Sequence, residues 1–201
     1  MVTHINHYVF KVIMLLQKAH NKILGYLFEH PNESFSVRHI AQSQKLNYRT
    51  AHDAISDLEK EGSVLVERLG NRNACKIATT LTPALFALEH QRTQRVLKQK
   101  TIRLALNTVY EDPFSCIVLF GSQATHNATK HSDIDICVIA DKQLLMKTKR
   151  AVARTSLPIQ LHAFTPQEFV SLINTRKENV THHIRNQRII LHGTELFYEL
   201  A

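Results

Sequence analysis

The chain of 201 residues is long enough for one or two domains with their own cores, and 44% hydrophobic with 21% charged residues is ordinary for a soluble globular protein. Its 25 Lys and Arg against 17 Asp and Glu give a net charge of +8, which favours a polyanionic partner but also fits a merely basic protein. Three widely spaced cysteines form neither a disulfide framework nor a metal-ligand pattern, so a cytoplasmic location is expected. The apolar stretch at residues 8–16 contains Lys11 and is too short to cross a bilayer, so no membrane association is expected.

The first 80 residues predict helices followed by a hairpin. Apolar residues at helical spacing indicate a helix from about residue 3 to residue 28, ending before Pro31. Ser36 is a candidate N-cap for a short second helix, and Asn47 is one for a third helix over residues 48–60. Residues 64–68 and 74–77 then read as two strands around a turn at residues 69–73.

This order of elements resembles a winged helix-turn-helix domain over roughly residues 19–80. The resemblance implies that the third helix enters the major groove of a duplex and that the wing contacts the backbone, so that duplex DNA or RNA is the expected partner. Residues 1–80 contain ten Lys and Arg against seven Asp and Glu, which is only weakly basic, and winged helices also serve as protein-docking modules. The nucleic-acid-binding residues that the resemblance implies are Tyr48, Arg49, Thr50 and His52 on the helix and Arg68 and Arg72 on the wing.

A single long helix is predicted over residues 84–110, because helical spacing of apolar residues continues there without Gly or Pro. Its basic, polar middle at residues 90–100 is interpreted as a solvated, rather stiff linker in preference to a nucleic-acid-binding stripe. Asp112-Pro113 marks the next boundary. The predicted domains are residues 1–80, a linker helix at 81–112, and a second domain at 113–201.

Two apolar runs then flank a polar loop. Residues 117–120 predict a buried strand that ends in Gly121-Ser122, and residues 133–139 predict a second strand. Its alternation places Asp133 and Asp135 on one face of that strand. Two carboxylates side by side repel each other, and Mg²⁺ or Mn²⁺ bridging them to a nucleoside triphosphate (NTP) would offset that repulsion. The alternative is a Gly-Ser turn with two solvent-facing Asp residues on an edge strand.

Phe120-Gly121-Ser122, followed after ten residues by Asp133-Ile134-Asp135, resembles the signature of DNA polymerase β-like nucleotidyltransferases, in particular their minimal members. Ser132, before the first Asp, matches the pattern too. The resemblance implies that Gly121, Ser122 and Ser132 bind the nucleotide, with the triphosphate at a helix start. It also implies that Asp133 and Asp135 bind the catalytic metals.

The sequence departs from that family pattern in two places. Gln160, on a strand predicted at residues 159–164, stands where active relatives have a third carboxylate, and glutamine cannot take a proton at neutral pH. His162 lies on the same face and is a candidate base, the alternative being a half-buried structural histidine. Thr125-His126 stand where relatives often have Arg-Gly, which leaves a triphosphate contact to Lys130 or His131, unless these two are solvated loop residues.

Further helices are predicted at residues 141–154, from a capping box at Thr165, and at 177–187, before a closing segment at 189–193. The expected fold class is α+β, with an N-terminal winged helix-turn-helix, a linker helix and a small mixed-sheet nucleotidyltransferase domain. The expected function is Mg²⁺-dependent transfer of a nucleoside monophosphate from an NTP to a hydroxyl acceptor. A DNA-binding regulator that senses nucleotide without efficient turnover, and an antitoxin beside a toxin-like protein partner, are the alternatives. Homodimerisation stays open.

Overall fold

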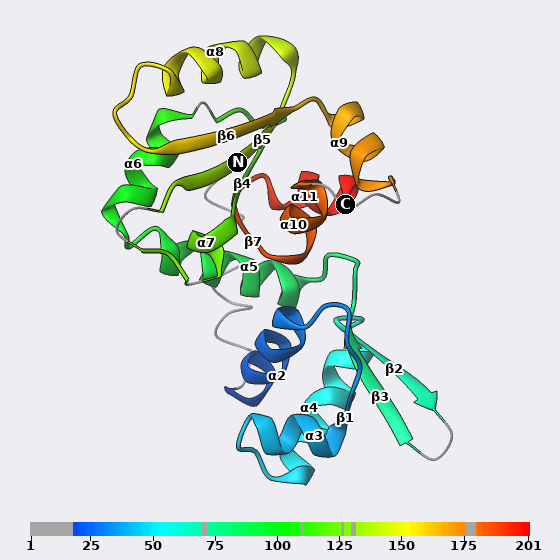
Figure 1. Ribbon diagram of the computed structural model, residues 1–201. Coiled ribbons are helices and arrows are strands. Elements are labelled where there is room, and N and C mark those ends of the chain that lie inside the picture. The colour runs from blue at the N-terminus through cyan, green and yellow to red at the C-terminus, as the bar shows by residue number, and fades with distance from the viewer. Residues whose placement is uncertain (1–17, 70–71, 110, 126, 130–131, 176–179) are drawn as a thin grey trace. The chain divides into compact units, whose positions relative to one another are not determined.

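The computed structural model describes residues 18–69, 72–109, 111–125, 127–129, 132–175 and 180–201 (Figure 1). It divides into two compact units, one ending at Leu88 and the other running from Glu89 to Ala201. Helices and two small sheets make up both units, and the α+β class is confirmed. The division falls between Leu88 and Glu89, whereas the sequence suggested boundaries at residues 80 and 113.

The first unit contains α2 (Lys18–Glu29), β1 (Phe35–Ser36), α3 (Val37–Ser43), α4 (Tyr48–Lys60), β2 (Val64–Leu69) and β3 (Arg72–Ile77). The predicted caps are present: the Ser36 hydroxyl accepts from the His39 amide, and the Asn47 side chain accepts from the Thr50 amide. The short strand β1 was not predicted, and it extends the hairpin into an antiparallel sheet of order β1-β3-β2. The part of the first predicted helix before residue 18 and part of the hairpin turn lie outside the described residues.

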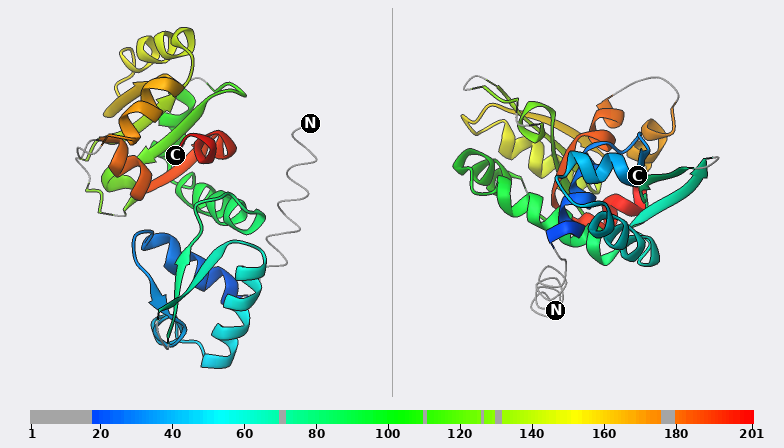
Figure 2. Two further views of the ribbon diagram at one scale, coloured as in Figure 1. Left: turned by 90° about the vertical axis from the view of Figure 1, so that its right-hand side faces the viewer. Right: turned by 90° about the horizontal axis from the view of Figure 1, so that it is seen from below.

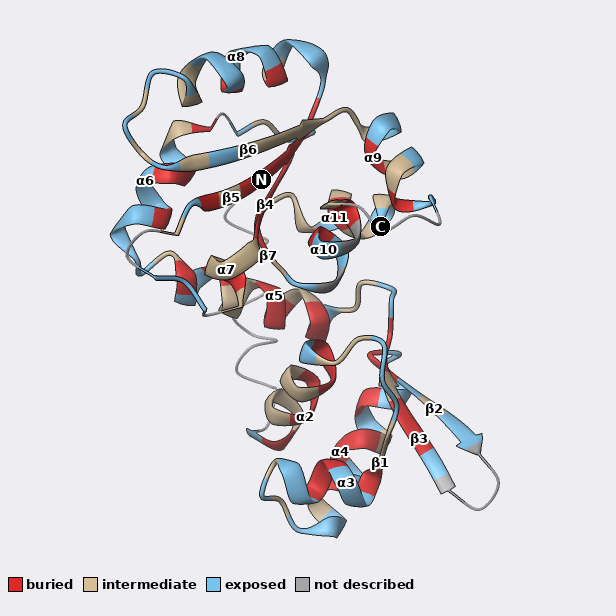
Figure 3. Cartoon of the chain, viewed as in Figure 1, coloured by how far each residue is buried: buried red, intermediate tan, exposed pale blue. Residues whose placement is uncertain are grey.

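The core of the first unit follows from the helical pattern. Ala51, Ala54, Ile55 and Leu58 form the buried stripe of α4, and they belong to one cluster with Ile23, Leu24 and Leu27 of α2. Figure 3 shows these buried stripes in red on the inner sides of α2 and α4. Burial of such aliphatic side chains stabilises a fold by roughly 1.5–3 kcal/mol each, which is enough to fix these helices against the sheet.

The single long helix predicted over residues 84–110 is wrong. Two helices occupy this stretch, α5 (Pro83–Val96) and α6 (Lys100–Thr108), with a turn in which the Gln99 amide donates to the Val96 carbonyl. The apolar side of α6 explains the break, because Ile102, Ala105 and Leu106 are buried in the core of the second unit. Tertiary packing thus overrides a local sequence that contains no helix breaker.

The second unit is built on the sheet β4 (Cys116–Phe120), β5 (Ile134–Ile139), β6 (Ile159–Phe164) and β7 (Arg188–His192). The order is β6-β5-β4-β7, with β5 and β6 parallel and the other pairs antiparallel. One face is covered by α6 and α8 (Lys142–Val152). The other is covered by α9 (Pro166–Ile173), α10 (Val180–Asn186) and α11 (Thr194–Leu200), so the unit has three layers (Figures 1 and 2).

Local signals at the end of the chain agree with the structure only in part. Thr165 and Glu168 form the predicted capping box at the start of α9. Helix α10 begins at Val180, and the predicted residues 177–179 lie outside the described chain. Helix α11 was not predicted. It follows Gly193, whose φ of +72° and whose approach to the Ser115 carbonyl, 2.2 Å from where a Cβ would stand, both require glycine.

Candidate active site

The strand register brings the candidate residues into one row across the sheet. Phe120, the last residue of β4, pairs with Asp135 of β5, and Asp135 pairs with Gln160 of β6. On the other side of β4, Phe120 pairs with Arg188 of β7. Paired residues on neighbouring strands project to the same face. Arg188, Phe120, Asp135 and Gln160 therefore lie side by side, on the face covered by α9, α10 and α11.

Gly121 directly follows this row, and Asp135 leaves no room for a side chain at Gly121. Its φ is +65°, in the left-handed region, and a Cβ at this position would lie 2.2 Å from Oδ2 of Asp135 and 3.0 Å from Cγ. No side chain fits there unless the carboxylate moves. The backbone that opens the short helix α7 (Gly121–Ala124) thus passes directly beside the carboxylate, and Ser122 follows, half-buried, in the same turn.

The electrostatics of Asp135 arise from burial and from two neighbours. Burial raises the pKa of its carboxyl group, the negative charge of Asp133 raises it further, and His162 acts in the opposite direction. Asp133 is exposed and immediately precedes β5. The structure therefore brings the two predicted carboxylates close enough to repel each other, and a cation between them would relieve that repulsion.

His162 lies at the same site. Its ring makes an edge contact with Phe120, with 5.2 Å between ring centroids, and it is half-buried. Gln160 is exposed next to Asp135. The register thus places a glutamine, and no carboxylate, beside Asp135 on the third strand, as the resemblance to the family pattern implied.

Comparison with known families agrees with this geometry. Residues 106–195 match the family model described as Polymerase beta, Nucleotidyltransferase. The second unit is therefore similar to a nucleotidyltransferase-type domain. The matched residues include Gly121, Ser122, Asp133 and Asp135, but they leave out the whole first unit. No curated protein matches the chain.

The loop of the second unit between α7 and β5 is held by its own hydroxyl groups. The Ser132 hydroxyl accepts a hydrogen bond from the Thr129 amide at 2.9 Å, so this side chain stabilises a turn. Its contact with nucleotide stays a prediction. The Thr125 hydroxyl lies 3.2 Å from the Gly121 carbonyl oxygen and closes α7. His126, Lys130 and His131, the other loop residues considered from the sequence, lie outside the described residues.

A buried ionic cluster beside the row was missed by sequence reasoning. Glu89 of α5 is fully buried, and its Oε1 accepts from Arg188 Nη2 at 3.3 Å and from the Tyr198 hydroxyl at 3.1 Å. The Arg188 guanidinium also lies 4.5 Å from the centre of the Phe197 ring. Burial, together with the charge of Glu89, raises the pKa of Tyr198. The cluster holds Arg188 of β7 in place beside Phe120. The feature of the sequence that could have indicated it is an acidic residue, Glu89, immediately after the apolar start of α5.

The two carboxylates fit a magnesium or manganese ion only with help from a substrate. Among the described residues, no group of three His, Cys, Asp and Glu side chains is arranged to hold a metal. Mg²⁺ in proteins is, however, commonly held by one or two carboxylates, with water and substrate phosphates completing its six ligands. Asp133 and Asp135, whose charges disfavour each other, have this donor chemistry.

The predicted nucleic-acid-binding residues lie on one helix and the hairpin of the first unit. Tyr48 and His52 of α4 are exposed, and the Arg49 side chain is 94% exposed. Asp53 lies between two of them, 4.0 Å from Arg49 Nε and 3.5 Å from His52 Nδ1. Thr50 is half-buried, Arg68 is exposed on β2, and Arg72 lies on β3 with a side chain outside the described structure. Across the described residues, no helix is long and apolar enough to span a membrane.

Proposed function

We propose that the second unit transfers a nucleoside monophosphate from an NTP to a hydroxyl acceptor, using Mg²⁺ or Mn²⁺. The observation that supports this most is the approach of the Asp135 carboxylate to Gly121, because a bend free of side chains beside an acidic group lets a phosphate and its metal come close to both. Asp133, at the start of the same strand, supplies the second carboxylate.

Each residue has a role in this proposal. Asp133 and Asp135 would hold the metal ion, and the ion would supply positive charge to offset the negative charge of the triphosphate and of the pyrophosphate leaving group. The backbone at Gly121 and the hydroxyl of Ser122 orient the phosphates. His162, half-buried near Asp135, accepts the proton of the acceptor hydroxyl in place of the absent third carboxylate. Rate enhancement then comes mainly from positioning and electrostatics.

We infer for the first unit a nucleic-acid-binding role of the winged-helix type. Its support is the order of α2, α3, α4 and the β2-β3 hairpin, together with the exposure of Tyr48 and Arg49 near the start of α4. The neighbouring Asp53 reduces the positive potential of this helix. Duplex binding through α4 alone is therefore expected to be modest and strongly dependent on salt.

A nucleotide sensor without efficient turnover is the second candidate, and Gln160 is the observation that favours it. The residue paired with Asp135 on β6 has no charge, so the site offers one carboxylate fewer than an active two-metal site needs. Sensor and enzyme differ in one respect that can be measured. Both bind NTP, but only the enzyme incorporates label into an acceptor.

The test of binding compares two double variants. Wild-type protein with Mn²⁺ and NTP should melt at a higher temperature than protein alone, since ligands that bind the native state stabilise it. Asp133→Asn/Asp135→Asn should lose this shift while staying folded. Glu195→Gln/Glu199→Gln removes the same charge from exposed positions on α11 and should keep it. An unchanged shift in the Asp double variant would show that nucleotide binds elsewhere.

The test of turnover uses radiolabelled NTPs and cell extract as a source of acceptors. If the enzyme is only impaired by Gln160, Gln160→Asp should raise incorporation at least tenfold, and His162→Ala should abolish it, because general base catalysis contributes about 10²–10⁴-fold. Gln167→Asp, at an exposed position of α9, is the matched control. Absence of incorporation in all variants that still bind NTP would establish the sensor.

A further inference from the structure

The basic residues of the second unit are concentrated in two segments. Residues 90–110 and 142–167 contain ten of the fifteen Lys and Arg found between residues 89 and 201, and none of the ten Asp and Glu. The two segments are far apart in sequence, but α6 and α8, which they contain, contact each other on one face of the sheet. The remainder of the unit therefore carries an excess of acidic residues, and the charge of the unit is strongly one-sided.

Nine of these ten basic residues are exposed, and we call the eight from Lys98 onward the α6–α8 surface: Lys98, Lys100, Arg103, Lys142, Lys147, Lys149, Arg150 and Arg154. The apolar sides of the two helices point into the core, as Ile102 of α6 and Leu145 of α8 show. None of the eight forms an ion pair with a carboxylate of the described chain. Like charges this dense repel one another, so an anionic partner would be attracted to the surface.

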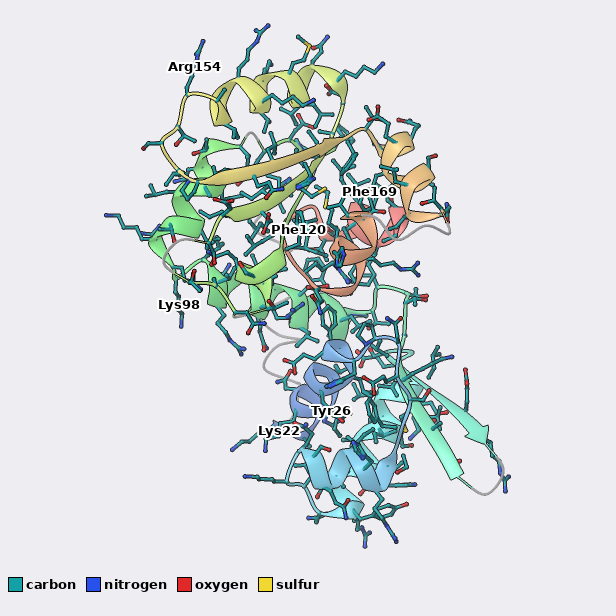
Figure 4. All side chains as sticks on the ribbon, in the orientation of Figure 1. Lys22, Tyr26, Lys98, Phe120, Arg154 and Phe169 are labelled. Carbon is teal, nitrogen blue, oxygen red and sulfur yellow. The ribbon has the colours of Figure 1, made fainter. Side chains whose placement is uncertain are left out.

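The topology places part of this surface at the same end of the sheet as the candidate site. Helix α8 connects the end of β5 to the beginning of the parallel strand β6. Its last turn, with Arg150 and the following Arg154, therefore returns to the end of the sheet where β5 begins, on the face opposite to that of Asp135. Figure 4 shows Arg154 and Lys98 pointing away from the sheet.

We propose that the α6–α8 surface binds the phosphate backbone of a nucleic-acid strand, the end of which is the acceptor of the transfer reaction. The binding surface stands on its own observations, whereas the acceptor role rests on the proposed function. From Lys142 to Arg154 the helix and its extension cover about 18 Å at 1.5 Å per residue, enough for several phosphates. A membrane surface fits less well, because in these helices only Leu104 and Met146 are exposed large apolar residues.

The experiment compares two triple variants of the full chain with equal loss of charge. Arg103→Gln/Arg150→Gln/Arg154→Gln alters the surface, and Lys18→Gln/Lys60→Gln/Arg185→Gln alters exposed positions elsewhere. Binding of labelled single-stranded RNA and DNA 20-mers is measured by fluorescence anisotropy across a range of KCl concentrations. The surface variant should bind at least tenfold more weakly in 0.1 M KCl, with the slope of log Kobs against log [KCl] reduced by about 2, since each phosphate contact on a single strand contributes roughly 0.7.

The outcomes separate this proposal from the proposed function. Equal weakening in both triple variants, or none in the surface variant, overturns the surface. If the surface variant loses binding to anionic vesicles but binds oligonucleotides as well as wild type does, the surface binds a membrane and the proposal is overturned. The Asp133→Asn/Asp135→Asn variant should bind oligonucleotides normally but incorporate no label. If binding depends on the surface but wild-type protein incorporates no label, the surface is upheld and the transferase is rejected. If the surface variant has a raised KM for the oligonucleotide and an unchanged kcat, both the surface and the transferase are upheld.

Discussion

Gly121→Ala tests the candidate site most directly, because the structure gives both parts of its cost. A residue with a Cβ at a φ of +65° is strained by roughly 1–2 kcal/mol in the left-handed region. The new Cβ would also meet Oδ2 of Asp135 at 2.2 Å, so the carboxylate must leave its position. Holding that side chain about 30° off its rotamer costs a further ~0.5–1.5 kcal/mol. We expect a total loss of about 2–3 kcal/mol in the free energy of unfolding.

Two other glycines provide controls for the two parts. Gly62 has a φ of +79°, but the nearest atom to an added Cβ is Thr82 Cγ2 at 4.0 Å, so Gly62→Ala measures strain without a clash. Gly25 lies inside α2 with nothing within 4 Å, and Gly25→Ala should stabilise its helix by roughly 0.5–1 kcal/mol. Chemical denaturation gives the three values, and melting with Mn²⁺ and NTP gives the effect on binding.

The contact itself is isolated by a double-mutant cycle. In an Asp135→Ala background the clashing Oδ2 and Cγ atoms are absent, so Gly121→Ala should cost about 1 kcal/mol less than in wild type. Nucleotide-dependent stabilisation should disappear in Gly121→Ala but persist in Gly62→Ala. The reasoning is refuted if Gly121→Ala keeps the full nucleotide-induced shift, since the phosphates would then not approach this bend.

Three further predictions concern burial. Burial raises the pKa of Asp135 above its value in the unfolded chain, so the ionised carboxylate destabilises the native state at neutral pH. This penalty is absent below the unfolded pKa of about 4. Asp135→Asn should therefore raise the Tm of the metal-free protein at pH 7 but not at pH 3.5. Glu89→Ala leaves the Arg188 guanidinium beside Tyr198 without its carboxylate and should cost about 3–5 kcal/mol in denaturant unfolding, against less than about 0.5 for Glu195→Ala. Burial raises the pKa of the Cys75 thiol to about 11, so Cys75 should resist iodoacetamide at pH 8 until the chain unfolds, and rapid labelling of the native protein would contradict its placement.

Helices and strands were predicted best where the local sequence contains a capping residue or a clear period of apolar residues. Asn47 before an amphipathic stripe, Thr165 with Glu168, and the alternation around Asp135 each specify a local conformation without tertiary contacts, and each prediction is confirmed. The position of Gln160 beside Asp135 agrees with the resemblance to the family pattern, in which Gln160 stands where relatives have a third carboxylate. The period of two by itself predicts only that Ile159 and Leu161 face the core.

The errors arose where packing between distant segments decides the structure. Nothing between Val96 and Lys100 breaks a helix locally, and the break follows from the burial of Ile102 and Leu106 against the sheet. The buried role of Glu89 was missed because its partners, Arg188 and Tyr198, are about a hundred residues away in the sequence. Short elements such as β1 and α11 depend on their neighbours in the same way, because isolated segments of this length are not stable alone.

The row from Arg188 to Gln160 connects the support of the site to its chemistry. At one end the guanidinium of Arg188 is held between Glu89 and Phe197, which fixes β7 against Phe120. At the other end Gln160 is exposed and carries no charge. The rigid end positions Phe120, and therefore Gly121 and Asp135. At the other end, the residue at position 160 determines whether a third carboxylate joins Asp133 and Asp135. Substitutions at Gln160 should accordingly change metal binding and turnover with little change in stability, and substitutions at Arg188 should do the reverse.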